Sequence, residues 1–269
     1  MCIFSAEVLR VSDTKILSTK LGQHRRGLVY QMKTSFENPT AMILPVPVKA
    51  GTSVNFFDWS KYYNFFDDLE KLFPRPTTRA MKSDSLSWDD KDSIEVVKVG
   101  AYIASFVPSK EDFERLDDCF KLSDSVFESL PYKEFAFVVA QLDPKESNKK
   151  IHPLAFTYDI ANEDYLFVPT VHVHDNKEVD RYGDFDHEVY VQWECNLGGF
   201  EESPFQPDQY GSKLDVEKVV DLISPVLPIC KNRYRGKLKN GDIVVKGNNA
   251  DLEFFDKQNV DELFYGVKA

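Results

Sequence analysis

Short apolar runs separated by turn-forming or polar residues are the feature of this sequence that most restricts its fold. Four β-type runs follow one another in the first third of the chain, at residues 2–9, 16–21, 28–36 and 41–48. Runs of this length with such boundaries are typical of consecutive strands. Pro45 and Pro47 remove backbone donors, so we expect the fourth run to lie at a sheet edge or to leave the sheet there.

Amphipathic helices are predicted between the blocks of strands. Apolar residues fall at helical spacing over 62–73, where Pro74 stops the helix, and again over 216–223. The spacing of Ser109 and Asp112 forms a capping box that predicts another helix start. Because the strands come in blocks and do not alternate with helices, the sequence predicts an α+β fold. This fold is a largely antiparallel β-sheet with several amphipathic helices packed on it.

The length and composition of the chain are those of a protein with a sizeable core. The 269 residues are 42% hydrophobic and 13% aromatic, which is ample for one buried core. We therefore expect a single α+β domain over residues 1–269. The polar, unpatterned loop at 76–92 is a candidate internal boundary.

The charge of the chain argues against two classes of partner. The sequence has 33 Lys and Arg residues against 44 Asp and Glu residues, a net charge of −11, which would repel nucleic acids and anionic membranes. No apolar run approaches the ~18 residues of a membrane span, and no basic leader precedes an apolar stretch. We expect a cytoplasmic protein with no nucleic-acid or membrane partner. Whether it contacts a protein partner or a small-molecule substrate stays open.

Four of the five histidines can be brought together by strand register. Three β-type runs follow one another, at 151–159, 165–174 and 186–193. Symmetric closure of the short loop between the first two runs sets His152 opposite His172. The same closure of the next connection sets His174 opposite His187. Residues two apart on a strand share a face, so all four side chains are predicted on one face.

This predicted histidine cluster suggests a metal site. Opposed strand residues have Cβ atoms about 4.5–5.5 Å apart, so their imidazoles can converge on one ion, at roughly 2.0–2.1 Å for zinc. Zinc or iron would suit these ligands, and its role is either Lewis-acid hydrolysis or simple metal binding. A one-residue slip of either hairpin would turn a histidine away, and buried histidines commonly just bond to backbone groups. A structural role for the histidines therefore also stays open.

Cys2 offers a second kind of chemistry. A cysteine after the initiator methionine is typical of N-terminal-nucleophile hydrolases, in which removal of the methionine exposes a thiol whose own α-amino group acts as base. The next β-type run, at 14–18, lacks the Arg or Asp that such hydrolases carry there. Cys2 as a small buried apolar residue is the simpler interpretation.

Several blocks of the chain together resemble an uncharacterised bacterial protein family. They are Met1-Cys2-Ile3-Phe4-Ser5, Leu28-Val29-Tyr30-Gln31-Met32, Met42-Ile43-Leu44-Pro45-Val46-Pro47, Phe106-Val107-Pro108-Ser109, His152-Pro153-Leu154-Ala155-Phe156 and His172-Val173-His174-Asp175. The resemblance spans roughly residues 1–195 and implies a shared fold. No activity is established for that family, so it implies no catalytic residue.

The sequence leaves three functions to be distinguished. The first is a metal-binding protein, in one version a hydrolase, that holds zinc or iron through His152, His172, His174 and His187. The second is a non-catalytic structural or protein-interaction protein. The third is a hydrolase with Cys2 as its nucleophile.

Overall fold

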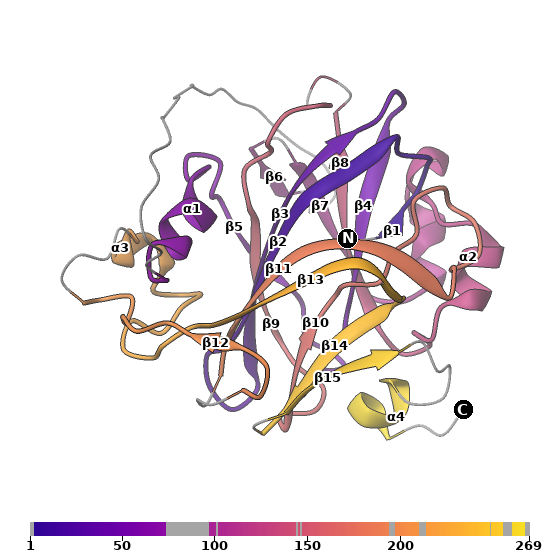
Figure 1. Cartoon of the computed structure of the whole chain (residues 1–269). Helices are drawn as coiled ribbons and strands as arrows, with labels where there is room; N and C mark the ends of the chain where they lie inside the picture. The colour runs from indigo at the N-terminus through magenta and orange to yellow at the C-terminus, as the bar shows by residue number, and fades with distance from the viewer. Residues whose placement is uncertain are drawn as a thin grey trace.

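A seven-stranded sheet runs through the middle of the molecule, as Figure 1 shows. The computed structural model describes residues 3–73, 97–100, 102–143, 145, 147–193, 197–209, 214–247, 249–254 and 260–266. From edge to edge, the strands of the central sheet are β12 (Glu201–Glu202), β13 (Cys230–Lys239), β11 (Tyr182–Gln192), β2 (Arg10–Lys20), β3 (Arg25–Ser35), β9 (Leu154–Asp159) and β5 (Asn55–Phe57). Strands from both ends of the chain therefore lie side by side in one sheet.

Two smaller sheets accompany the central one. The five-stranded sheet has the order β1 (Ile3–Phe4), β4 (Thr40–Val46), β8 (Ala136–Leu142), β7 (Tyr102–Val107) and β6 (Val97–Val99). The three-stranded sheet has the order β10 (Tyr165–Val168), β14 (Gly241–Lys246) and β15 (Asn249–Phe254). Among the described strands, β2 and β11 form the only parallel pair, and all other paired strands are antiparallel.

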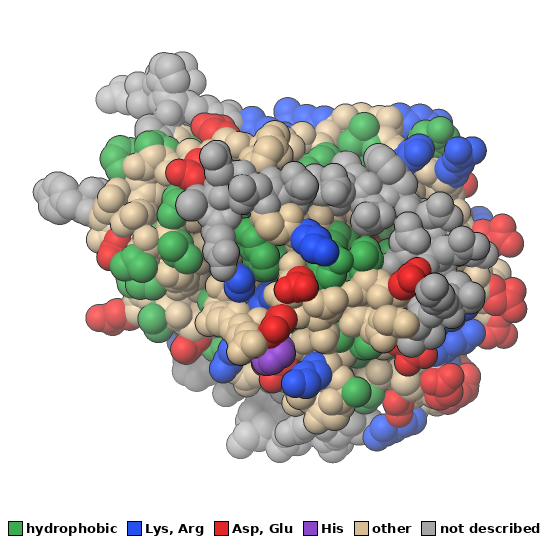
Figure 2. Space-filling view, turned by 90° about the horizontal axis from the view of Figure 1, so that it is seen from below, with side chains coloured by type: hydrophobic (Ala, Val, Ile, Leu, Met, Phe, Trp, Pro, Cys, Tyr) green, Lys and Arg blue, Asp and Glu red, His purple; other side chains and the backbone are tan. Residues whose placement is uncertain are grey.

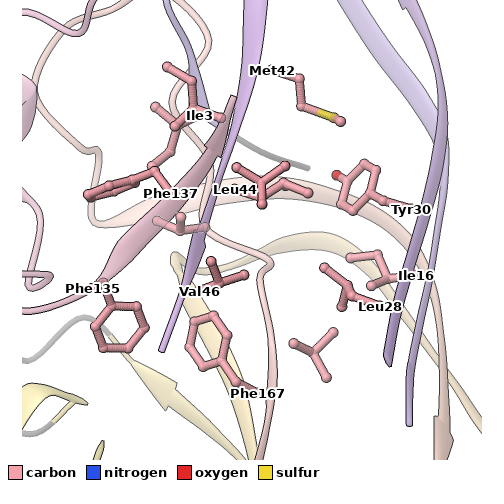
Figure 3. Packing of buried hydrophobic residues seen from close by; sticks show 14 of the residues in the cluster. Ile3, Ile16, Leu28, Tyr30, Met42, Leu44, Val46, Phe135, Phe137 and Phe167 are labelled. Atoms are coloured by element: carbon pink, nitrogen blue, oxygen red, sulfur yellow. The ribbon is translucent and has the colours of Figure 1, made fainter. Parts of the chain in front are cut away.

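Hydrophobic side chains are buried on both faces of the central sheet. Successive residues of a strand point to opposite faces, so Ile16 and Leu28 enter one core while their neighbours Leu17 and Val29 enter another. The first core fills the space between the central sheet and the five-stranded sheet. In Figure 3, Ile16, Leu28 and Tyr30 face Leu44 and Val46 across this space. Burial on both faces explains why the strands read as near-continuous apolar runs.

The second core lies under two short helices on the opposite face of the central sheet (Figure 1). Helix α1 (Phe65–Glu70) contributes Phe65, Phe66 and Leu69, and the segment that begins with α3 (Val216–Val219) contributes Leu222 and Ile223. The apolar stripe predicted over 62–73 is therefore buried, but only its middle is α-helical. The rest of this segment forms turns. Packing of its aromatic rings stabilises it without a continuous helix.

The predicted α+β class is wrong, because the described chain is mainly β-structure. Its α-helices have at most six residues each, and besides α1 and α3 they are α2 (Asp124–Ser129) and α4 (Val260–Tyr265). The helix predicted from Ser109 is replaced by the 3-10 turns η1 (Glu111–Arg115) and η2 (Asp118–Phe120). Apolar spacing alone does not separate a helix from a chain of turns that buries the same side chains, since tertiary packing supplies most helical stability.

The prediction made from the prolines of the fourth strand is confirmed in one of its two alternatives. The chain leaves the sheet after Val46, directly before Pro47. Strand β4 lies between β1 and β8, so it is not an edge strand. However, β1 pairs only with Met42 and Ile43. The side of β4 that faces β1 therefore has no described strand partner at Pro45, where a missing donor is tolerated.

Two further points bear on the sequence predictions. The candidate boundary at 76–92 lies outside the described residues. No helix in the described ranges combines the length and the apolar character that a membrane crossing requires.

Candidate functional site

The segment that carries His172 and His174 is held by side chains from the C-terminal part of the chain. It follows β10 and adds no regular strand of its own. Asn240 accepts a hydrogen bond from the backbone N–H of His172 and donates one to the carbonyl of the same residue, both at 2.8 Å. On its other side, the segment receives backbone hydrogen bonds from Phe4 and Val8. These bonds fix the direction of both histidines.

Asp242 anchors the start of the same segment. One carboxylate oxygen accepts hydrogen bonds from the backbone N–H groups of Thr170, at 2.7 Å, and Val171, at 3.0 Å. The hydroxyl of Tyr132 donates a short hydrogen bond to the other oxygen. Burial raises the pKa of Asp242 to about 6, although these three donors favour its charged form. Asp242 is thus a buried structural carboxyl whose charge is costly at neutral pH.

Three of the four predicted histidines lie together. The ring centroid of His172 lies 5.7 Å from that of His174 and 5.1 Å from that of His187, which comes from β11. Phe185 packs on the His172 ring at 4.1 Å. A Cβ added to Gly183 would come within 2.9 Å of His172 Nδ1, so a residue without a side chain is needed beside this ring.

The ring nitrogens of this cluster are buried and short of partners. In the part of the chain that the structure describes, no hydrogen-bond partner is present for Nε2 of His172, Nε2 of His174 or either ring nitrogen of His187. The hydroxyl of Thr14, which is paired with His187 in the parallel register, is also without a partner there. Burial lowers the pKa of His174 to about 4 and lowers that of His172 further. These two imidazoles are therefore neutral at pH 7.

His152 lies in a different place. Its buried ring packs edge-on against Tyr102, with centroids 4.9 Å apart, and its Nδ1 lies 2.9 Å from the carbonyl oxygen of Pro153. A Cβ on Gly100 would meet its Nε2 at 2.4 Å. This environment is that of a core histidine.

The predicted hairpins are wrong, which explains the separation of His152. Strand β9 pairs with β3 and β5, and β10 pairs with β14 from the far end of the chain. His187 lies opposite Tyr234 and Thr14, not opposite His174. Loop length favours pairing of neighbouring runs, but burial against distant strands decides the pairing here.

The histidine cluster does not have the geometry of a metal centre. Within the described ranges, no group of three or more His, Cys, Asp or Glu side chains is placed to hold a metal ion. The planes of the His172 and His174 rings lie 22° apart, with the ring centroids 5.7 Å from one another. Cys2, the predicted nucleophile, lies outside the described residues.

A surface feature that the sequence prediction did not single out lies at the β12 edge of the central sheet. Beyond β12, Ser203 donates a backbone hydrogen bond to Ile229, and Asp208 donates one to Pro225. Residues 204–207 and 226–228 thus run side by side between these two bonds. They expose Phe205, Val226 and Leu227, which are 43%, 57% and 39% accessible to solvent.

Acidic residues border these apolar side chains. Glu201, Glu202 and Asp208 are exposed, and none of the three has an ion pair with a described residue. We call this group the apolar–acidic patch; it consists of Glu201, Glu202, Phe205, Asp208, Val226 and Leu227. Single apolar side chains are normal on protein surfaces. Figure 2 illustrates this on one face of the molecule, where hydrophobic side chains lie among charged ones. The patch differs because three large apolar side chains occur in two adjacent loop segments, next to the β12 edge.

The patch carries a weak signal in the sequence. Pro204-Phe205 and Val226-Leu227-Pro228 are apolar residues without strand or helix periodicity, close to prolines. Such residues cannot be assigned to a core from spacing. Their exposure depends on the edge position of β12, which only the sheet order reveals.

Comparison with known proteins adds little that can be used. No protein-family model and no curated protein matches the chain, so its resemblance to a bacterial family is neither supported nor contradicted. Among solved structures, the crystal structure of baculovirus P35 is similar with 14% identity and a TM-score of 0.46 over 91% of each chain. The caspase-8/P35 complex is similar with 14% identity and a TM-score of 0.40 over 87% of each chain. At these TM-scores the likeness says nothing about the function of this chain.

Proposed function

We propose that this chain is a non-catalytic protein-binding protein that contacts its partner through the apolar–acidic patch. The observation that carries the proposal is the exposure of Phe205, Val226 and Leu227 side by side at a sheet edge. Large exposed apolar groups of this kind mark interaction sites, and an aromatic residue at the centre of an interface often contributes most of its energy.

The position of the candidate catalytic side chains favours this proposal over an enzyme. His152 and His187 are fully buried, and His172 is 6% exposed. A general acid or base must reach the proton that it transfers, at about 2.6–3.2 Å or through one water. Of the four histidines, only His174 is partly exposed. The buried rings of His152, His172 and His187 therefore suit packing roles better than proton transfer with a substrate that arrives from solvent.

A photo-crosslinking experiment tests the proposal. A benzoylphenylalanine is placed at Phe205 or at Leu227 in cells that express the protein, and any adduct is identified by mass spectrometry. Leu9, which is 63% exposed and directly precedes β2, is the matched control position. We expect one protein adduct at Phe205 and Leu227 that is absent at Leu9. The adduct partner, purified separately, should form a stoichiometric complex with the unmodified chain in sedimentation analysis. Equal labelling at all three positions, or no reconstituted complex, would contradict the proposal.

A second candidate function is binding of a divalent ion by His172, His174 and His187. One observation favours it: their buried ring nitrogens include four without a described hydrogen-bond partner. Binding would require the rings to turn, since no group of described side chains is placed to hold a metal ion as it stands. Elemental analysis of untagged protein purified without chelator should then find about one zinc or iron per chain. The double variant His172→Ala/His174→Ala should lose it, and metal-free native protein would eliminate this candidate.

A further inference from the structure

The charge of the apolar–acidic patch restricts what can dock on it. Its three charged members, Glu201, Glu202 and Asp208, all carry negative charge. Two of the described basic residues within ten positions of the patch are already engaged. Lys218 forms an ion pair with Asp215 at 2.7 Å. Lys231, opposite Glu201 in the register, is buried and bonds to Glu70 at 2.9 and 3.0 Å. These cations are therefore occupied elsewhere.

The edge strand itself offers few backbone groups. Strand β12 has only two residues and pairs with β13 on one side. A partner that extended the sheet would gain few main-chain hydrogen bonds here. Recognition must then come from side chains, namely the apolar group of Phe205, Val226 and Leu227 and the carboxylates beside it.

We propose that the patch docks a basic segment of another protein, in which Lys or Arg residues flank an aromatic or large aliphatic side chain. This inference rests on the function proposed above and adds the chemistry of the partner. The apolar side chain of the partner packs on Phe205 and Leu227. Its cations lie against Asp208 and along the β12 edge, where Glu201 and Glu202 point to opposite faces of the sheet. Such complementarity raises the association rate and excludes acidic partners.

A second copy of the chain does not fit the same patch. A twofold interface places each surface patch against its own copy, so two sets of three carboxylates would meet. The chain as a whole also carries a net charge of −11, which opposes self-association. Sedimentation analysis tests self-association directly. If the chain is a dimer that Leu227→Ser converts to a monomer, the proposal is overturned.

The direct test is a binding titration with two labelled synthetic peptides. The first alternates Lys or Arg with Phe or Leu, and the second has the same apolar residues with Glu at each basic position. Fluorescence anisotropy is followed at low and at high salt. We expect the basic peptide to bind the full chain with a Kd below about 1 mM, several-fold more weakly at high salt, and the acidic peptide not to bind.

Matched variants separate the patch from general attraction to an acidic protein. Glu201→Gln/Glu202→Gln is compared with Glu37→Gln/Asp164→Asn, which removes the same charge from exposed positions elsewhere. Leu227→Ser is compared with Leu9→Ser. Each patch variant should weaken binding at least about fivefold, whereas the controls should change it less than about twofold.

The outcomes also distinguish this inference from the proposed function. If patch and control variants bind the basic peptide equally, or if the peptide does not bind, the basic-partner inference is overturned. The proposed function would still stand if the crosslinked partner requires Phe205 and Leu227 but is indifferent to the glutamates. If Phe205 and Leu227 crosslink no partner, both fail together.

Discussion

Replacement of Asp242 by asparagine should change how stability depends on pH. The carboxyl is buried and binds the backbone of Thr170 and Val171 and the hydroxyl of Tyr132. Its pKa is raised from 3.8 to about 6, first of all by burial. Asparagine has nearly the same shape and keeps an oxygen for the two N–H groups, but it never ionises. The variant therefore removes the titration and largely keeps the anchor.

The magnitude follows from the pKa difference between the folded and unfolded states. Because the folded-state pKa is the higher one, the stability that this carboxyl contributes is fully present below about pH 4 and is lost as the pH rises through 6. A shift of about two units corresponds to about 3 kcal/mol at roughly 1.4 kcal/mol per unit. That is a large part of the total stability of about 5–15 kcal/mol expected for a folded protein.

Urea unfolding of both proteins between pH 4 and pH 8 measures this effect. Other titrating groups are common to both proteins and cancel in the difference. The free energy of unfolding of Asp242→Asn, relative to the unsubstituted protein, should rise by about 3 kcal/mol from pH 4 to pH 7 and then level off. A difference that does not vary with pH would refute the reasoning.

The companion variant Asp242→Ala tests the anchor itself. It leaves the N–H groups of Thr170 and Val171 and the hydroxyl of Tyr132 without their acceptor. Each buried group left unsatisfied costs about 1–3 kcal/mol, so we expect a loss of at least about 3 kcal/mol at pH 7. A loss below about 1 kcal/mol would mean that water replaces the carboxyl.

Three further predictions concern single side chains. His174 has a folded-state pKa of about 4, below its unfolded value, so its contribution to stability is present above pH 6.5 and is lost as the pH falls towards 4. His174→Phe cannot take up this proton, so urea unfolding should show a loss of stability at acid pH that is smaller by about 3 kcal/mol. Gly183→Ala places a Cβ against the His172 ring and should lower stability by about 1–3 kcal/mol, seen as a lower Tm. Gly22→Ala, where an added Cβ meets nothing within 4 Å, is the matched control and should leave the Tm nearly unchanged. The hydroxyl of Ser123 caps α2 by accepting a hydrogen bond from the backbone N–H of Val126. Ser123→Ala removes this cap and should lower the free energy of unfolding by about 1 kcal/mol in chemical unfolding.

The local character of much of the chain could be predicted from the sequence. The runs at 16–21 and 28–36 lie largely within β2 and β3, and the stripe at 62–73 is buried. These features depend on nearest neighbours along the chain, which apolar spacing records directly. The same spacing overestimated the helices, because a short helix with turns buries the same aromatic rings.

Pairing between distant strands could not be predicted in the same way. The partner of β10 is β14, which lies some 75 residues later, and no loop length encodes that choice. His172 and His174 share a cluster because they lie two residues apart on an extended segment. His187 joins them through a parallel pairing with β2 that the hairpin argument did not contain. His152 was assigned to the cluster only through a hairpin that does not form.

The parallel pairing of β2 with β11 also has a consequence for how the chain is made. Thr14 of β2 pairs with His187 of β11, which is synthesised much later. The β2–β11 pairing at the centre of the main sheet therefore cannot form until most of the polypeptide has left the ribosome. At roughly 5–20 residues per second, this delay is on the order of ten to thirty seconds. During that time one side of β2 is an open strand edge, which can pair with the wrong chain. Strand pairing over so long a sequence distance makes folding slow. The risk of aggregation is therefore greatest for the nascent chain and lower for the folded protein.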